Sequence, residues 1–154
     1  MNVKDIMTKK VITVDADLSI VDAAKLMVEH KLSGLPVVKH GQVVGIITET
    51  EIVGTRKGVT LPPEVPVLDA LVYFDDPANG DEVEKQLKKM FATKVRELMR
   101  PNPTVISSTA SITEAATLIV EKNISPLPVV DDGRLVGMLG RYDILRMIAS
   151  HKGA

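Results

Sequence analysis

The side chains that could perform acid–base, nucleophilic or metal chemistry are few and scattered in this chain. The sequence has three histidines and no cysteine, which excludes thiol nucleophiles, disulfides and cysteine-based zinc sites. His30, His40 and His151 fall at a helix end, a hairpin turn and the chain terminus by pattern, without metal-ligand spacing or a paired serine. No Gly-x-Gly-x-x-Gly or P-loop sequence occurs. The sequence therefore predicts a protein that is not an enzyme and requires no cofactor or metal.

Acidic and basic residues are nearly balanced, with 20 Asp and Glu against 19 Lys and Arg and a formal charge of −1. This balance gives no general attraction to nucleic acids or anionic membranes, and the small basic clusters at 55–57 and 85–94 are typical of exposed helix faces. The first residues lack the apolar core of a signal peptide, and the uncharged stretch between Arg100 and Glu114 is too short to span a bilayer. We therefore expect a soluble, cytoplasmic protein.

The chain contains an internal duplication. Residues 7–52 align without a gap onto residues 99–144, and 17 of the 46 paired positions are identical. A hydrophobic content of 45% in 154 residues is ordinary for a globular protein. A unit of about 50 residues cannot bury an adequate core alone, so the two copies are expected to pack together. Such packing about a pseudo-twofold axis creates two related clefts, and clefts between repeats are favoured ligand sites.

Each copy shows the same succession of predicted elements. A short helical turn ends at Met7 or Met99, and it is followed by an extended segment and an amphipathic helix capped by Ser19 or Ser111. Two strand-like runs with a short connection then form a hairpin, and a second helix closes the copy. The predicted strands are 11–14, 35–38 and 42–48, then 104–106, 127–130 and 134–140, and the closing helices are 49–55 and 141–151. The fold class is α+β, with two tandem β-α-β-β-α repeats.

A helical insert separates the repeats, which gives boundaries of 1–56, 57–94 and 95–154. Helices are predicted at about 67–74 and 81–92, after a proline-rich loop. They either pack on the module or form a dimer or partner surface. Residues 75–86 do not match a calcium loop, because Pro77 and Gln86 occupy positions that need oxygen ligands.

The repeated motifs resemble the cystathionine-β-synthase (CBS) domain. The first copy has DIM at 5–7, ITV at 12–14, SGLPVV at 33–38 and GIITETEI at 45–52, and the second has ELM at 97–99, SPLPVV at 125–130 and GMLGRYDI at 137–144. Together they resemble a tandem CBS pair, or Bateman module. This resemblance implies a regulatory protein that binds AMP, ADP, ATP, S-adenosylmethionine or a similar adenosine-containing ligand. It also implies a homodimer and, because the chain has no effector domain, a separate effector protein.

The resemblance also implies which residues line each cleft. The family motif Gly-x-x-Ser/Thr-x-x-Asp supplies a carboxylate to the ribose hydroxyls from one copy, while the early strand and hairpin come from the other. The first cleft would use Met7, Ile12, Leu32 and Gly34 with Asp143. The second cleft would use Met99, Thr104, Ile124 and Pro126 with Thr48 and Glu51.

Both copies depart from the family motif. Glu51 replaces the usual Asp in the first copy, and Gly140 replaces the usual Ser or Thr in the second. The first cleft keeps a ribose acceptor of the usual length, so we favour it as the ligand site. Arg141 and the basic residues after the leading turns, Lys9, Lys10 and Arg100, are candidates for phosphate contacts or else solvated surface charges. These residues leave open whether the ligand is a nucleotide or an adenosyl compound with an uncharged tail. The alternative function is a dimerisation scaffold that has lost ligand binding.

Overall fold

The computed structural model describes residues 1–54 and 92–151 of the chain. The first repeat contains α1 (Val3–Ile6), β1 (Val14–Asp15), α2 (Ile20–His30), β2 (Gly34–Lys39), β3 (Gln42–Thr48) and α3 (Glu49–Gly54). The second repeat contains α6 (Val95–Leu98), β4 (Arg100–Pro101), α7 (Ile112–Val120), β5 (Leu127–Asp131), β6 (Arg134–Leu139) and α8 (Arg141–Ser150). The helical insert predicted between the repeats lies outside the described residues, except for its last few.

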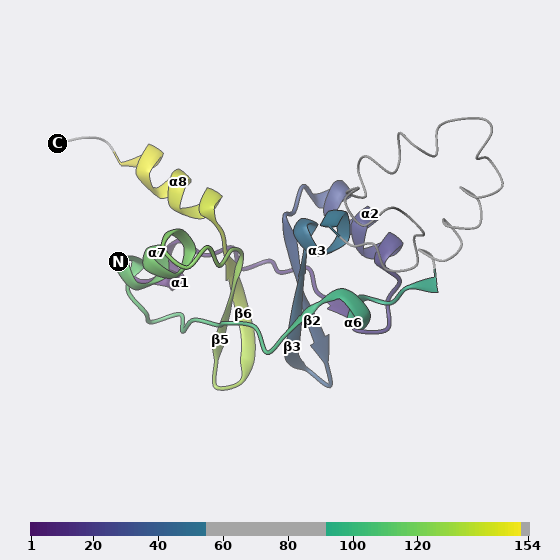
Figure 1. The fold of residues 1–154 in the computed structure, drawn as a ribbon. Coiled ribbons are helices and arrows are strands. Elements are labelled where there is room, and N and C mark those ends of the chain that lie inside the picture. Colours follow the sequence, from purple (N-terminus) through teal and green to yellow (C-terminus); the bar gives the residue numbers. More distant parts are fainter. Residues whose placement is uncertain (55–91, 152–154) are drawn as a thin grey trace, which may run out of the picture.

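The two repeats lie side by side, with the hairpins β2–β3 and β5–β6 adjacent at the centre and the longer helices outside them (Figure 1). The mixed α+β fold predicted from the sequence is confirmed. The first sheet has the order β1-β2-β3-β4, so a strand of the second repeat pairs with β3 of the first. The exchange is mutual, because Thr8 forms an antiparallel bridge with Met138 in β6.

The first strand of each repeat is shorter than predicted. β1 contains only Val14 and Asp15, since the residues before it turn away toward the space between the repeats. In the second repeat this strand is reduced to Ile106, which forms a single parallel bridge with Val129. Prolines at positions 101 and 103 remove backbone donors just before it, which limits its pairing.

Local sequence signals explain the helix starts and hairpin turns. The Ser19 and Ser111 hydroxyls each accept a hydrogen bond at 3.1 Å from the backbone N–H three residues later, as predicted for N-caps. The hairpins close through two residues, His40–Gly41 and Asp132–Gly133, and all four have positive φ angles between 49° and 78°. Both residues of a type I′ turn need positive φ, which glycine adopts without steric cost. Even the β-bulges coincide in the two repeats, at Val37/Val38 and Val129/Val130.

The leading segment of each repeat packs into the core of the other. Val3 of α1 is fully buried in the second core, and its N–H donates to the Ala110 carbonyl at 2.9 Å. Val95 of α6 is fully buried in the first core, with its N–H on the Leu18 carbonyl at 2.8 Å. The first core also contains Val14, Ala16, Ile20, Ala23, Met27, Leu35, Val37 and Ile47, and the second also contains Ile106, Ala115, Ile119, Leu127, Val129 and Leu139. Each core is therefore completed by the other repeat.

Two glycines permit the exchanged segments to cross the central strands. At Gly137, an added Cβ would lie 2.5 Å from the Met7 sulfur and 3.0 Å from the Thr8 carbonyl oxygen. At Gly45, the equivalent distances to the Met99 sulfur and the Arg100 carbonyl oxygen are 2.5 and 2.9 Å. Because the second contact in each case is with backbone, a side-chain rotation cannot relieve it.

Replacing Gly137 by alanine is expected to lower the free energy of unfolding by about 1–3 kcal/mol, through overpacking at the crossing. Chemical denaturation of the purified variant measures this loss. Gly140→Ala is the comparison variant, because a Cβ there would meet its nearest atoms only at 3.9 Å, and its loss should be limited to the cost of alanine at a helix N-cap. Equal stability of the Gly137→Ala variant and the natural protein would contradict a close crossing at this strand.

Asp131, at the end of β5, ties this strand to the segment before α7. Its carboxylate accepts hydrogen bonds from the Ser108 hydroxyl at 2.5 Å, the Ser108 N–H at 3.0 Å and the Ser107 hydroxyl at 3.2 Å. The Ser108 hydroxyl and N–H lower the pKa of Asp131 below its ordinary value, and the charge of Lys4 acts in the same direction. The ionised form is therefore the one that the fold stabilises.

The lowered pKa predicts a pH-dependent effect of Asp131→Asn. The contribution of this carboxylate is present above its ordinary pKa of 3.8, and it is lost as the pH falls through the lower folded value. The natural protein should therefore be more stable than the variant near neutral pH, and the difference should shrink in acid. Urea denaturation at several pH values measures it, and a difference that does not change with pH would contradict the assignment.

Candidate ligand cleft between the repeats

A cavity of about 250 Å³ lies between the two repeats on the side where α8 begins. The first repeat and its leading segment contribute Thr8, Lys10, Val11, Ile12, Lys31, Leu32, Ser33, Gly34 and Pro36. The second repeat contributes Pro126, Met138, Gly140, Tyr142, Asp143 and Arg146. Most of this lining is apolar, with the charged side chains of Lys10, Lys31, Asp143 and Arg146 among it. Such a lining can enclose an organic ring and orient it by a few polar contacts.

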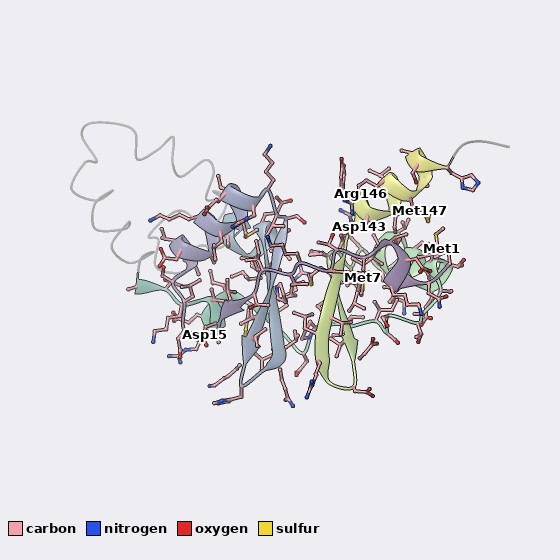
Figure 2. The ribbon with its side chains drawn as sticks, turned by 180° about the vertical axis from the view of Figure 1, so that it is seen from behind. Met1, Met7, Asp15, Asp143, Arg146 and Met147 are labelled. Carbon is pink, nitrogen blue, oxygen red and sulfur yellow. The ribbon has the colours of Figure 1, made fainter. Side chains whose placement is uncertain are left out.

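Asp143 is the carboxylate of this cavity, and it is only 7% exposed. Its Oδ2 accepts a hydrogen bond from the Gly140 N–H at 2.8 Å, while its Oδ1 accepts from the Thr8 hydroxyl at 3.0 Å. The guanidinium of Arg146 also donates to Oδ1. Figure 2 shows Asp143 and Arg146 together at the end of α8 nearer the first repeat. The buried charge is thus compensated on both oxygens.

The start of α8 fixes the position of this carboxylate. β6 ends at Leu139, Gly140 is the N-cap, and Asp143 is the third residue of the helix. An acidic residue at this position accepts the free N–H of the N-cap, and it also lies in the favourable field of the helix N-terminus. Asp143 therefore caps its own helix while it faces the cavity.

The exchanged leading segment forms another wall. Thr8 pairs with β6 through two backbone hydrogen bonds with Met138, at 2.8 and 2.9 Å. This pairing places the Thr8 hydroxyl against Asp143 and leads the chain on through Val11 and Ile12. The cavity therefore depends on the contact between the repeats.

The corresponding carboxylate of the second cleft has different partners. Glu51 accepts hydrogen bonds from the Thr48 N–H at 2.7 Å and from the Thr48 hydroxyl, and its other oxygen forms an ion pair with Arg100. In the duplication Arg100 corresponds to Thr8, and Glu51 corresponds to Asp143. The residues at these equivalent positions therefore meet in both clefts, through a hydrogen bond in the first and an ion pair in the second. A polar pocket of about 160 Å³ beside this pair is lined by Ser33, Thr48, Glu49, Thr50, Arg100, Asn123, Ser125 and Arg141.

The structure brings four of the five residues predicted for the first cleft around one cavity: Ile12, Leu32, Gly34 and Asp143. Met7, the fifth, packs on Gly137 and the second core instead. Lys10, one of the candidates for a phosphate contact, lines the cavity. Their roles in binding a ligand remain predictions.

The residues predicted for the second cleft are less well grouped. Thr48 and Glu51 are in contact, but Met99 packs on Gly45 and the first core, and Ile124 packs on the second core. Thr104 is exposed and does not line either pocket described above. Pro126 faces the first cavity, beside Gly34. Arg141 lies outside the first cavity and donates a hydrogen bond to the Asn123 side chain at 2.5 Å.

Sequence reasoning missed several lining residues, among them Thr8, Met138, Lys31, Tyr142 and Arg146. A signal for Arg146 exists, because it lies three residues after Asp143 on a predicted helix, where an ion pair between neighbouring turns is favoured. Lys31 is the C-cap residue that follows α2, and it has a left-handed backbone (φ 54°). The sequence gives no comparable signal for its position at the cavity.

The fold and the cavity define a class: a tandem-repeat module whose two halves exchange their leading segments and enclose a cleft. Residues 3–58 and 95–150 match the family model of the CBS domain, and the chain belongs to this family as a tandem CBS pair. A relative in Methanocaldococcus jannaschii, the uncharacterised protein MJ1426, is 37% identical over 96% of this chain and 91% of its own length.

Solved structures of CBS pairs share the fold. The crystal structure of CBSX2 of Arabidopsis thaliana in complex with AMP is 28% identical, with a TM-score of 0.73 over 99% of both chains. The CBS domain pair of protein MJ0100, in complex with 5′-methylthioadenosine and S-adenosyl-L-methionine, is 28% identical, with a TM-score of 0.69 over 99% of this chain and 98% of that one. Among the described residues of the present chain, no helix is long and apolar enough to cross a membrane.

Proposed function

We propose that this protein is a regulatory sensor that binds an adenosine-containing ligand in the first cleft and signals to a separate effector protein. The observation that carries the proposal is the buried Asp143 carboxylate in a cavity with walls from both repeats. Relatives of the same fold were crystallised with AMP and with adenosyl compounds, which supports this ligand class. The cytoplasmic location predicted from the sequence stays a prediction.

Asp143 is suited to hold a ribose. A carboxylate accepts hydrogen bonds at about four positions, and bonds to an ionised acceptor are among the stronger ones. The apolar part of the lining, including Ile12, Leu32 and Met138, would then cover the faces of the adenine ring. The Ser33–Gly34 segment also lines the cavity, where its backbone would meet the adenine edge.

We propose that each chain binds one such ligand. In the second cleft, both oxygens of the Glu51 carboxylate are engaged, by Thr48 on one side and by Arg100 on the other. A ribose would have to displace Arg100 from Glu51 there, as it would displace Arg146 from Asp143 in the first cleft. The pocket beside Glu51, however, is smaller than the first cavity, about 160 Å³ against about 250 Å³, and its lining is mostly polar and offers little apolar surface to an adenine ring. The second cleft is therefore the weaker site.

The signal would arise from the contact between the repeats. A ligand that contacts Ile12 and Leu32 in one repeat and Asp143 in the other favours the arrangement in which all three are close. The effector protein would read this shift in population. None of these steps requires the protein to catalyse a reaction.

A calorimetric titration with AMP, ADP, ATP, S-adenosylmethionine, NAD and GTP tests the function. We expect heat from adenosine-containing ligands but not from GTP, with a stoichiometry of one per chain. A thermal-shift assay provides a second readout, because a ligand at a hundred times its Kd stabilises the fold by about 2.7 kcal/mol. The lack of any response to all adenosine ligands would contradict the sensor, and it would favour the dimerisation scaffold.

We also propose that the protein is a homodimer that associates through its outer helices. Large apolar side chains are exposed at matching positions of the two repeats, Val28 with Val120 and Val53 with Leu145. In the first repeat, Val28 and Val53 line an apolar groove at α2 and α3, together with Ala24, Met27, Leu32 and Ile52. Exposed apolar surface that recurs in this way is typical of association surfaces.

The double variant Val120→Glu/Leu145→Glu is expected to be monomeric, because association would bury two new charges without partners. Sedimentation equilibrium of both proteins measures the change in mass. Val105→Glu is the matched control, since Val105 is also exposed but lies beside the hairpin residues Gln42 and Val43. A natural protein that is already monomeric would contradict the homodimer.

A further inference from the structure

We infer that the first cleft selects ligands whose adenosine carries a phosphate group over adenosyl compounds with a neutral or cationic tail. This inference rests on the proposed function and names the ligand class within it. Three cations, Lys10, Lys31 and Arg146, line the cavity among its described residues, against the one carboxylate of Asp143. The chain as a whole is nearly neutral, so this local excess of positive charge belongs to the cleft.

Lys10 and Lys31 approach the cavity from separate segments of the first repeat. Lys10 follows the exchanged leading turn, and Lys31 is the C-cap residue after α2. In the part of the chain that the structure describes, neither ammonium group forms an ion pair. Both charges are therefore available to a ligand, and lysine ammonium groups are common phosphate partners in proteins.

Arg146 is the third cation, and its present partner is the group that a ribose would need. Among the described residues, Oδ1 of Asp143 accepts hydrogen bonds from both Thr8 and Arg146, whereas Oδ2 accepts one, from the Gly140 N–H. The two hydroxyls of a ribose can therefore be accepted if one takes the open position on Oδ2 and the other replaces Arg146 on Oδ1.

The displaced guanidinium would remain at the cavity. The Arg146 side chain is 55% exposed and lies over the Tyr142 ring, 5.5 Å from its centroid, which leaves it room to turn. An ionised phosphate offers it charge-assisted, bidentate hydrogen bonds in place of the one to Oδ1 that the carboxylate had accepted. A phosphorylated ligand thus compensates Arg146 after the exchange, while adenosine leaves its charge without a partner.

The tails of adenosyl compounds differ in the charge that they bring to this site. AMP carries a phosphate of about −1.5 to −2 near neutral pH, which three nearby cations attract. The tail of 5′-methylthioadenosine is neutral, and S-adenosylmethionine carries a positive sulfonium next to the ribose. We therefore expect the order of affinity AMP, then adenosine and 5′-methylthioadenosine, then S-adenosylmethionine.

Calorimetric titrations of the natural protein with these four ligands test the inference. AMP should bind at least about tenfold more tightly than adenosine, and added salt should narrow this ratio. Equal affinity for AMP and adenosine would overturn the phosphate preference while the adenosine site itself stands. If none of the four ligands binds, the proposed function fails and this inference fails with it.

The variant Arg146→Gln separates the partner exchange from a general charge effect. It should weaken the binding of AMP by about tenfold. The affinity for adenosine should stay unchanged or rise, because the ribose no longer competes with a guanidinium for Asp143. The double variant Lys10→Ala/Lys31→Ala should weaken the binding of AMP but not the binding of adenosine. Lys39→Ala, at the exposed end of β2 and outside the cavity, is the charge-matched control. Equal weakening of AMP and adenosine in Arg146→Gln would contradict the exchange.

Discussion

Replacing Asp143 by alanine is expected to weaken binding of AMP by about 10- to 100-fold. The variant removes the acceptor of the ribose hydroxyls, and hydrogen bonds to a charged group contribute about 1.5–3 kcal/mol. It also leaves Arg146 without its carboxylate partner at the cavity. Isothermal titration of the purified variant measures the change, and circular dichroism establishes that the protein is folded, since Asp143 also caps α8.

Glu51→Ala is the matched control for this experiment. Glu51 occupies the equivalent position in the first repeat and caps α3 through the Thr48 N–H, so its loss affects the fold in a similar way. It lies outside the first cavity, and affinity for AMP should therefore stay within about twofold of the natural value. An unchanged Kd in Asp143→Ala, or an equal loss in Glu51→Ala, would refute the assignment of the ligand to the first cleft.

Introducing Glu51→Asp together with Arg100→Thr is expected to raise the stoichiometry of AMP binding from one to two per chain. These substitutions give the second cleft the same acid and the same hydroxyl that meet in the first, Asp143 and Thr8. They remove the ion pair that engages Glu51 in the natural protein. Titration calorimetry with a known concentration of active protein measures the number of sites.

The single variant Arg100→Thr separates the effect of the ion pair on binding from the effect of the longer acid. Arg100→Thr alone frees Glu51 but leaves the longer acid, so a second site should be weak or undetectable. Adding Asp143→Ala to the double variant should return the stoichiometry to one, with AMP now in the second cleft. A double variant that still binds one ligand per chain would show that the ion pair does not close this cleft.

Much of the fold could be predicted because the same signals occur twice. Ser19 and Ser111 cap equivalent helices, and the motifs around Pro36 and Pro128 lie in equivalent hairpins. The β-α-β-β-α order follows from these local signals. The predicted strands at 11–14 and 104–106 were too long. Val11 and Ile12 line the cavity instead of pairing, and in the second repeat only Ile106 pairs, through a single bridge.

The cleft could be predicted only in part. The resemblance to the CBS domain implies that Asp143 faces residues of the other repeat, but it does not show where the leading segments go. Met7 and Met99 were assigned to the clefts, whereas they cover Gly137 and Gly45 at the crossing. Long-range contacts of this kind leave no periodic pattern in the sequence. The proximity of Lys31 and Arg146 is also tertiary, since 115 positions separate them in the chain.

The exchange of leading segments has a consequence for how the chain is made. During synthesis, residues 1–54 leave the ribosome before Val95, so the first core is missing one of its fully buried side chains until the second repeat emerges. Val3, in turn, has no core to enter until residues 106–139 have been added. Neither half is a self-sufficient folding unit, and both close late, through contacts between residues about a hundred positions apart. A fragment cut between the repeats would expose an unfilled core, whereas separately expressed halves carry the pieces with which to complete each other.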